Sequence, residues 1–110
     1  ALFDLDHDRD VLDATRRARL AYASAPGIYA ADALAWGLFK LGRCGEARAR
    51  SERALRLGTK DALLYFHRGM IERCLGSSSA RSWFERALAT NPHFSLRFAP
   101  VAREMLAATP

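Results

Sequence analysis

The strongest constraint on the fold of this 110-residue chain is an internal repeat with a period of 33 to 34 residues. The stretches SERALRLGT (51–59) and FERALATNP (84–92) align without a gap. A third, shorter copy ends at ARLAYASAP (18–26), again 33 residues earlier. The columns that agree across the three copies are Ala14/Ala47/Ala80, Ala18/Ser51/Phe84, Ala21/Ala54/Ala87 and Pro26/Thr59/Pro92. A repeat of this length is typical of stacked supersecondary units, each of which needs its neighbour to bury its apolar side.

Each copy of the repeat predicts two helices. Small apolar residues recur at helical spacing, and Gly42 and Gly76 are typical signals for a helix C-terminus. Asp61 is placed to cap the helix that follows it, and Ser78 or Ser79 the next one. No segment alternates as a strand does, so the sequence predicts an all-α stack of short helices. The expected helices are 10–24, 29–41, 46–57, 62–75, 80–90 and 100–108.

Gly69 stands inside one of these predicted helices, where a glycine costs roughly 1 kcal/mol relative to alanine. We expect this glycine to permit close approach of the following helix, which contributes Ala87 as the second small residue and Phe84 as bulk. Arg68 and Glu72 flank it at i,i+4 spacing, which permits a salt bridge.

These features together resemble the tetratricopeptide repeat. The matching positions are Gly69, Gly76, Ala80, Phe84, Ala87 and Pro92 in 62–92; Ala35, Gly42, Ala47, Ser51, Ala54 and Thr59 in 28–59; and Ala14, Ala18, Ala21 and Pro26 in 14–26. The middle copy lacks the aromatic residue and the proline, and Arg68 and Glu72 replace large apolar residues.

The resemblance implies a right-handed α-solenoid of antiparallel helix pairs. It implies a partial repeat at 1–26, in which 1–8 is the end of a first helix, repeats at 27–59 and 60–92, and a capping helix at 93–110. The residues expected to pack the repeats together are Ala35, Ala54, Gly69, Phe84 and Ala87.

The resemblance also implies a peptide-binding groove lined by the first helix of each pair. Carried over to this chain, the groove positions are Tyr29, Asp32, Trp36, Phe39, Lys40, Leu63, Phe66, His67, Met70, Arg73 and Arg103. This set is aromatic and basic, which suits an extended peptide with apolar side chains and a carboxylate. A second interpretation stays open, in which Trp36, Phe39 and Phe66 fill the core between repeats.

No catalytic or metal-binding constellation is evident in the sequence. The acidic stretch DLDHDRD (4–10) superficially resembles a calcium loop, but Val11 and Arg17 stand where a glycine and a bidentate glutamate are required. The three histidines are not at zinc-ligand spacing. Cys74 and His67 are two helical turns apart, about 10 Å, which is too far for a nucleophile and its base. We therefore expect no enzyme activity, no cofactor and no metal.

The net charge of +5 arises from 17 Lys+Arg and 12 Asp+Glu, and it motivates nucleic-acid binding as an alternative function. Within the Arg-rich helix 46–57, however, Glu46 and Glu52 precede Arg50 and Arg56 by four residues. This self-compensation indicates a solvated face, so a nucleic-acid partner is the weaker expectation.

The leading expectation is therefore a non-catalytic scaffold for protein–protein interaction, whose partner is another protein or peptide, an acidic one being well suited. Self-association is a third alternative, because Leu2, Phe3 and Leu5 would belong to an exposed terminal helix face.

No targeting signal is evident, and we expect a cytoplasmic segment of a longer protein. No apolar run approaches the roughly 20 residues that span a bilayer, so no membrane insertion is expected. The first ten residues carry four aspartates where a signal peptide would be basic and then apolar. Cys44 and Cys74 are not spaced as CxxC, and free thiols in a reducing compartment are expected.

Overall fold

A computed structural model describes residues 11–56 and 60–108, and every regular element within these ranges is an α-helix. The six helices are α2 (Val11–Ser24), α3 (Ile28–Lys40), α4 (Cys44–Leu55), α5 (Ala62–Cys74), α6 (Ala80–Thr90) and α7 (Phe98–Ala108). The predicted all-α class and the sequence of short helices are thereby confirmed. The chain divides into two compact units, 1–58 and 59–110, which are described separately.

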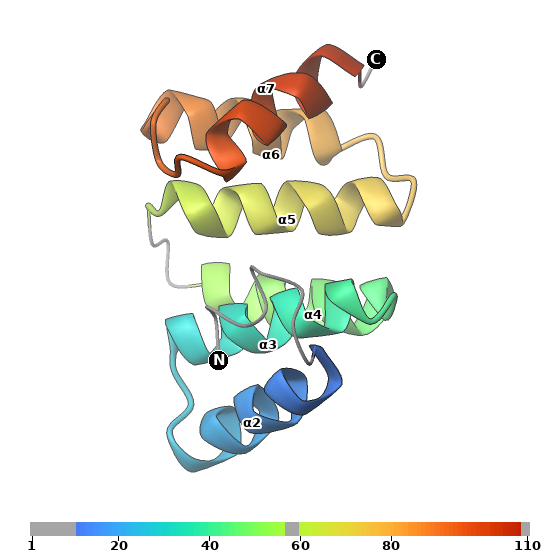
Figure 1. Cartoon of the computed structure of the whole chain (residues 1–110), viewed down its shortest axis with the longest axis vertical. Helices are drawn as coiled ribbons and strands as arrows, with labels where there is room; N and C mark the ends of the chain where they lie inside the picture. The colour runs from blue at the N-terminus through green and yellow to red at the C-terminus, as the bar shows by residue number, and fades with distance from the viewer. Residues whose placement is uncertain (1–10, 57–59, 109–110) are drawn as a thin grey trace. The chain divides into compact units, whose positions relative to one another are not determined.

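In the first unit, consecutive helices run antiparallel and α3 packs against both α2 and α4 (Figure 1). α3 is the most apolar of the three and buries Leu34, Ala35 and Leu38 completely or nearly so. Its neighbours contribute small side chains at helical spacing, which keep their backbones close to it. The buried small residues are Ala14 and Ala18 on α2, and Ala47, Ser51 and Ala54 on α4.

In the second unit, α6 packs against both α5 and α7, and the three helices again alternate in direction (Figure 1). Its core is aromatic and is centred on Phe66, which is fully buried. The Phe66 ring centre lies 5.0 Å from that of Phe98, 5.7 Å from that of Phe94 and 6.1 Å from that of Phe84. Offset and tilted aromatic pairs at these separations stabilise a core beyond their buried area.

The turns after α3 and α5 have the same hydrogen-bonded geometry. Gly42 and Gly76 adopt φ of 81° and 70°, the left-handed region that glycine enters without a Cβ clash. After α3, the amide of Gly42 donates to Phe39 O at 2.9 Å, and the next amide, that of Arg43, to Leu38 O at 2.8 Å. The equivalent bonds after α5 are Gly76 to Arg73 at 3.0 Å and Ser77 to Glu72 at 2.9 Å. Each is a Schellman turn, and corresponding residues of the two turns stand 34 positions apart in the sequence.

The small-residue columns of the repeat are buried with one exception. The triplets Ala14/Ala47/Ala80 and Ala18/Ser51/Phe84 are buried throughout. In the third triplet Ala54 and Ala87 are buried, whereas Ala21 is exposed on the last turns of α2. Ala21 therefore does not share the packing role of Ala54 and Ala87.

Two helix starts differ from the prediction by two residues. α4 begins at Cys44, two residues early, and α7 begins at Phe98, where the Ser95 hydroxyl accepts from the amides of Arg97 and Phe98. Asp61 caps α5 as predicted, since its carboxylate accepts from the amides of Leu63 at 3.0 Å and Leu64 at 3.4 Å.

The serine cap predicted for α6 is only half right. Ser79 occupies the cap position, but its side chain makes no capping hydrogen bond. The hydroxyl of Ser77 instead accepts from the Ser79 amide at 3.2 Å. The Ser77 hydroxyl therefore binds the amide of the cap residue itself.

Gly69 meets the second helix of its pair, as the sequence predicts. A β-carbon built on Gly69 would stand 2.6 Å from Cε1 of Phe84, so the aromatic ring lies directly on the glycine backbone. A second close approach occurs in the first unit, where a β-carbon on Gly37 would overlap Oγ1 of Thr15. Thr15 is buried and donates to Val11 O at 2.6 Å.

Several sequence predictions lie outside the described residues. These are the helix end at 1–8, the acidic stretch 4–10 with His7, the apolar residues Leu2, Phe3 and Leu5, and Thr59.

The expectation of two free thiols is wrong, because neither Cys44 nor Cys74 is a free cysteine in the structure. The expectation of a reducing compartment loses the support that it drew from these thiols.

Candidate functional site

The predicted groove residues of the first unit all lie on α3, and they differ in accessibility. Asp32 and Trp36 are buried, Phe39 and Lys40 are half-buried, and Tyr29 is 64% exposed. The rings of Trp36 and Phe39 stack with centres 4.7 Å apart, and Lys40 Nζ lies 5.5 Å from the centre of the Trp36 ring. An ammonium over an indole face is attracted by the ring quadrupole. Of the predicted groove residues on α3, Tyr29, Phe39 and Lys40 are therefore the ones that a partner can reach.

The predicted groove residues of the second unit lie mostly on α5. Phe66 and His67 are buried, Leu63 and Met70 are half-buried, and Arg73 is exposed. Phe66 is the centre of the aromatic core of its own unit. The aromatic contacts of Phe66 and the burial of Trp36 favour a core role for both residues over direct contact with a ligand.

Arg103, the last predicted groove residue, lies on α7 and is exposed. Its Nη1 donates to Pro92 O at 3.1 Å, which ties α7 to the loop that leaves α6. A small cavity of about 90 Å³ adjoins it, lined also by His93 and by Leu96, whose side chain is fully exposed.

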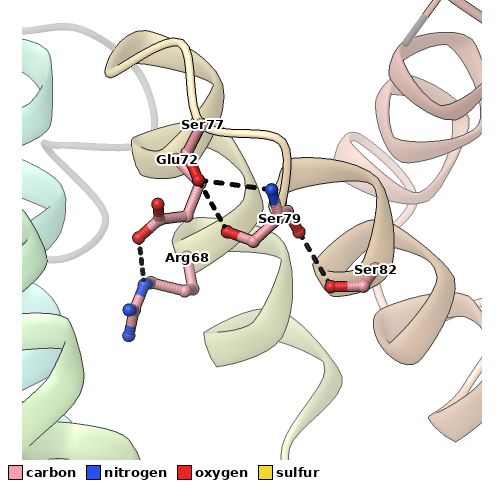
Figure 2. Close-up of polar contacts among 5 residues, drawn as sticks. All are labelled: Arg68, Glu72, Ser77, Ser79 and Ser82. Atoms are coloured by element: carbon pink, nitrogen blue, oxygen red, sulfur yellow. Dashed lines mark hydrogen bonds and ion pairs between the residues drawn. The ribbon is translucent and has the colours of Figure 1, made fainter. Parts of the chain in front are cut away.

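A cluster of arginine and aromatic side chains joins α5 to α6. Arg68 Nε lies 2.7 Å from Glu72 Oε2, which confirms the predicted salt bridge (Figure 2). The guanidinium carbon of Arg68 lies 5.0 Å from the centre of the Trp83 ring, and that of Arg86 lies 4.8 Å from it. Arg86 also lies 5.3 Å from the centre of the Tyr65 ring. The Trp83 ring thus attracts both guanidinium groups, and Arg68 is in addition paired with Glu72.

Sequence reasoning missed Tyr65 and Arg86 as members of this cluster. A signal was present, because Tyr65 precedes Arg68 by three residues and Arg86 follows Trp83 by three, the spacing of one helical turn.

Serine hydroxyls in the turn between α5 and α6 are engaged within that turn (Figure 2). The hydroxyls of Ser77 and Ser79 lie 2.9 Å apart, and Ser82 Oγ donates to Ser79 O at 2.8 Å. These contacts stabilise the turn, and they involve no acid or base that would activate a serine nucleophile.

A larger cavity, of about 250 Å³, lies in the first unit where α2 ends, α3 begins and α4 ends. Its lining residues are Tyr22, Pro26, Gly27, Ile28, Arg53 and Arg56. Arg50 lies beside it, with its guanidinium carbon 5.8 Å from the centre of the Tyr22 ring. The sequence places Pro26 in a repeat column and the arginines on a solvated face, but it does not indicate that they lie together.

The charge compensation predicted within α4 is different in the structure. Glu46 pairs with Arg43 at 3.5 Å and with Arg19 of α2 at 3.6 Å, rather than with Arg50. The guanidinium of Arg50 lies near the Tyr22 ring, and its predicted partner Glu46 is shared between Arg19 and Arg43.

Within residues 11–56 and 60–108, no three His, Cys, Asp or Glu side chains are grouped so that they could hold a metal ion. Among the helices of these same residues, none has both the length and the apolar character needed to cross a membrane. Comparison of the chain with protein-family models, curated proteins and solved structures found no match.

Proposed function

We propose that this chain is a tetratricopeptide-like array of helix pairs that serves as a non-catalytic protein-interaction module. The observation that carries the proposal is the pair of equivalent Schellman turns, which end α3 and α5 at positions 34 residues apart. Two identical helix endings, each followed by a helix with a buried small-residue stripe, support repetition of one structural unit. Such units are typical of stacked solenoids, and we propose a right-handed solenoid here.

Each unit offers accessible residues on the first helix of its helix pair as proposed partner contacts. In the first unit these are Tyr29, which is exposed, and Lys40, which is half-buried; in the second unit Arg73 is exposed. Aromatic and arginine side chains are the usual anchors of protein interfaces. The partner that fits this chemistry is an extended peptide segment that carries apolar and acidic side chains.

A capture experiment with a triple variant tests the proposal. The chain and its Tyr29→Ala, Lys40→Glu, Arg73→Glu variant are immobilised and exposed to a lysate, and retained proteins are quantified by mass spectrometry. Circular dichroism must show that the variant keeps its helix content. We expect a specific set of partners to be lost from the variant and retained by an Arg16→Glu control, whose exposed site lies on α2.

Salt dependence then separates the proposal from nucleic-acid binding. Phosphate-dominated binding loses roughly 10³- to 10⁵-fold in affinity between 50 and 200 mM salt when six to ten phosphates are contacted. A contact made mainly by aromatic side chains changes far less. Equal retention of partners by the chain and the triple variant would contradict the proposed function. So would a binding affinity that falls as steeply between 50 and 200 mM salt as that of phosphate-dominated binding.

A further inference from the structure

The cavity at the junction of α2, α3 and α4 carries positive charge that no acid among residues 11–56 and 60–108 pairs with. Arg53 and Arg56 line it, and neither side chain makes an ion pair or a hydrogen bond within the part of the chain that the structure describes. Two other exposed arginines are compensated by acids: Arg43 pairs with Glu46, and Arg81 with Glu85. Two uncompensated guanidinium groups at one cavity therefore attract an anionic group from outside the chain.

The other walls of the cavity are apolar. Tyr22, Pro26 and Ile28 present ring and aliphatic surface, and Ile28 and Tyr22 are both half-buried there. Gly27 precedes α3 without a side-chain cap, so the first-turn amides add a favourable field for negative charge. A ligand suited to this site combines an anionic group with an adjoining apolar group.

The size of the cavity limits what can enter it. A volume of about 250 Å³ equals the space of about eight water molecules. It lies below the roughly 300–1,000 Å³ of pockets that enclose drug-sized ligands. It accommodates one amino-acid side chain and is too small to enclose a dinucleotide cofactor.

We infer that this cavity binds a partner peptide, taking one apolar side chain between Tyr22, Pro26 and Ile28 while an adjacent Asp or Glu carboxylate bonds to Arg53 and Arg56. The inference rests on the proposed function and moves a principal contact from the first helices to the junction of α2, α3 and α4. A guanidinium matches a carboxylate with two parallel N–H donors, which gives geometric specificity that a lysine would not.

The test uses a defined peptide in place of an unknown partner. Acetyl-Leu-Glu-Leu-Glu-amide is titrated into the isotopically labelled 110-residue chain, and amide shifts are followed by NMR. We expect saturable shifts at Tyr22 and Ile28, and at least about 5-fold weaker binding of the matched peptide acetyl-Leu-Gln-Leu-Gln-amide.

Variants identify the residues responsible. Arg53→Gln and Arg56→Gln should each weaken binding of the acidic peptide about 5-fold, whereas Arg16→Gln on the exposed face of α2 should leave it unchanged. Tyr22→Ala should weaken both peptides, because it removes an apolar wall. If the Tyr22→Ala chain is misfolded, the two arginine variants still decide the question, since both side chains are exposed.

Three results would overturn the inference. The first is equal weakening by Arg16→Gln, which would show a general charge effect. The second is displacement by inorganic phosphate with no effect of the peptide's leucines, which would show an anion site only. The third is shifts confined to residues near Lys40 or Arg73, which would reject this cavity while supporting the proposed function. The proposed function itself is tested separately, by comparing the partners captured by the chain and by its Tyr29→Ala, Lys40→Glu, Arg73→Glu variant.

Discussion

The ring of Phe84 lies on the backbone of Gly69, and the absent β-carbon of the glycine is what makes room for it. An added Cβ would meet Cε1 at 2.6 Å and Cδ1 at 2.7 Å, distances that real β-carbons essentially never show. Phe84 is fully buried and its ring centre is 6.1 Å from that of Phe66. The ring therefore has core atoms around it and cannot simply swing away. The helix-weakening glycine in α5 is compensated by close packing with α6.

We predict that Gly69→Ala lowers the free energy of unfolding by up to about 2 kcal/mol. Alanine favours the helix by about 1 kcal/mol, but overpacking a filled site costs about 1–3 kcal/mol. Urea denaturation followed by circular dichroism measures the difference. Gly45→Ala is the matched control on α4, because nothing lies within 4 Å of its Cβ, and it should be neutral or slightly stabilising. Equal stability of the two variants would show that Phe84 does not fill this space.

A second background isolates the contact. In a Phe84→Leu chain the atoms that meet the Gly69 Cβ are removed, so Gly69→Ala should cost less there than in the parent. Contacting residues typically show coupling energies of about 0.5–3 kcal/mol. Additive effects would place the destabilisation somewhere other than this pair.

Local signals in the sequence predict most of the fold. Gly42, Gly76 and Asp61 act on backbone groups within a few residues, so their roles follow from position alone. The small-residue columns predicted which faces are buried, because helical spacing fixes a face. Ala21 departs from this pattern and is exposed, because the repeat does not show which residues of each copy are covered by a neighbouring helix.

The sites depend on contacts between separate helices, and the sequence does not show which residues of different helices meet. In the sequence, Trp36 and Phe66 fit a binding groove and a packed core equally well. Only their burial in the structure distinguishes these two roles. Arg53 and Arg56 look like part of a solvated face until α2 and α3 bring Tyr22 and Ile28 beside them. The close approach of Gly37 to Thr15 is not evident from the sequence, because neither residue belongs to a repeat column.

The equivalence of the two Schellman turns predicts equal sensitivity to substitution. Gly42→Ala and Gly76→Ala should each cost about 1–2 kcal/mol, since both backbones are left-handed and nothing crowds either Cβ. Asparagine, which tolerates this conformation better, should cost less than alanine at both positions. Chemical denaturation of the four single variants gives the comparison. A cost at one turn and none at the other would contradict their structural equivalence.

The cap of α5 predicts a specific loss at Asp61. Its carboxylate accepts from two amides of the first turn, and Asp61→Ala should destabilise the chain by about 0.5–2 kcal/mol. Ser78→Ala provides the comparison, because Ser78 is exposed and makes no interaction within the described residues. It should change stability by less than about 0.5 kcal/mol. Asp61→Asn should retain most of the stability, since its amide oxygen can still accept.

Two Arg–Glu pairs with the same i,i+4 spacing should differ sharply in what they contribute. The side chains of Arg68 and Glu72 are 11% and 3% exposed and lie 2.7 Å apart, whereas those of Arg81 and Glu85 are 44% and 54% exposed and 3.7 Å apart. Glu72→Ala leaves a largely buried guanidinium without its carboxylate and should cost about 3–5 kcal/mol. Glu85→Ala breaks a solvated pair and should cost no more than about 1 kcal/mol.

The apolar double variant completes the argument about the buried pair. Replacing both partners, as in Arg68→Met with Glu72→Leu, removes the charge together with its desolvation cost and should recover most of the stability lost in Glu72→Ala. Recovery should be incomplete, because Arg68 also lies over the Trp83 ring. Denaturation at low and high salt distinguishes the pairs, since salt screens the exposed one far more than the buried one. If Glu72→Ala and Glu85→Ala were equally mild, the guanidinium of Arg68 would have to reach water in solution, and the cluster with Trp83 would not hold it in place.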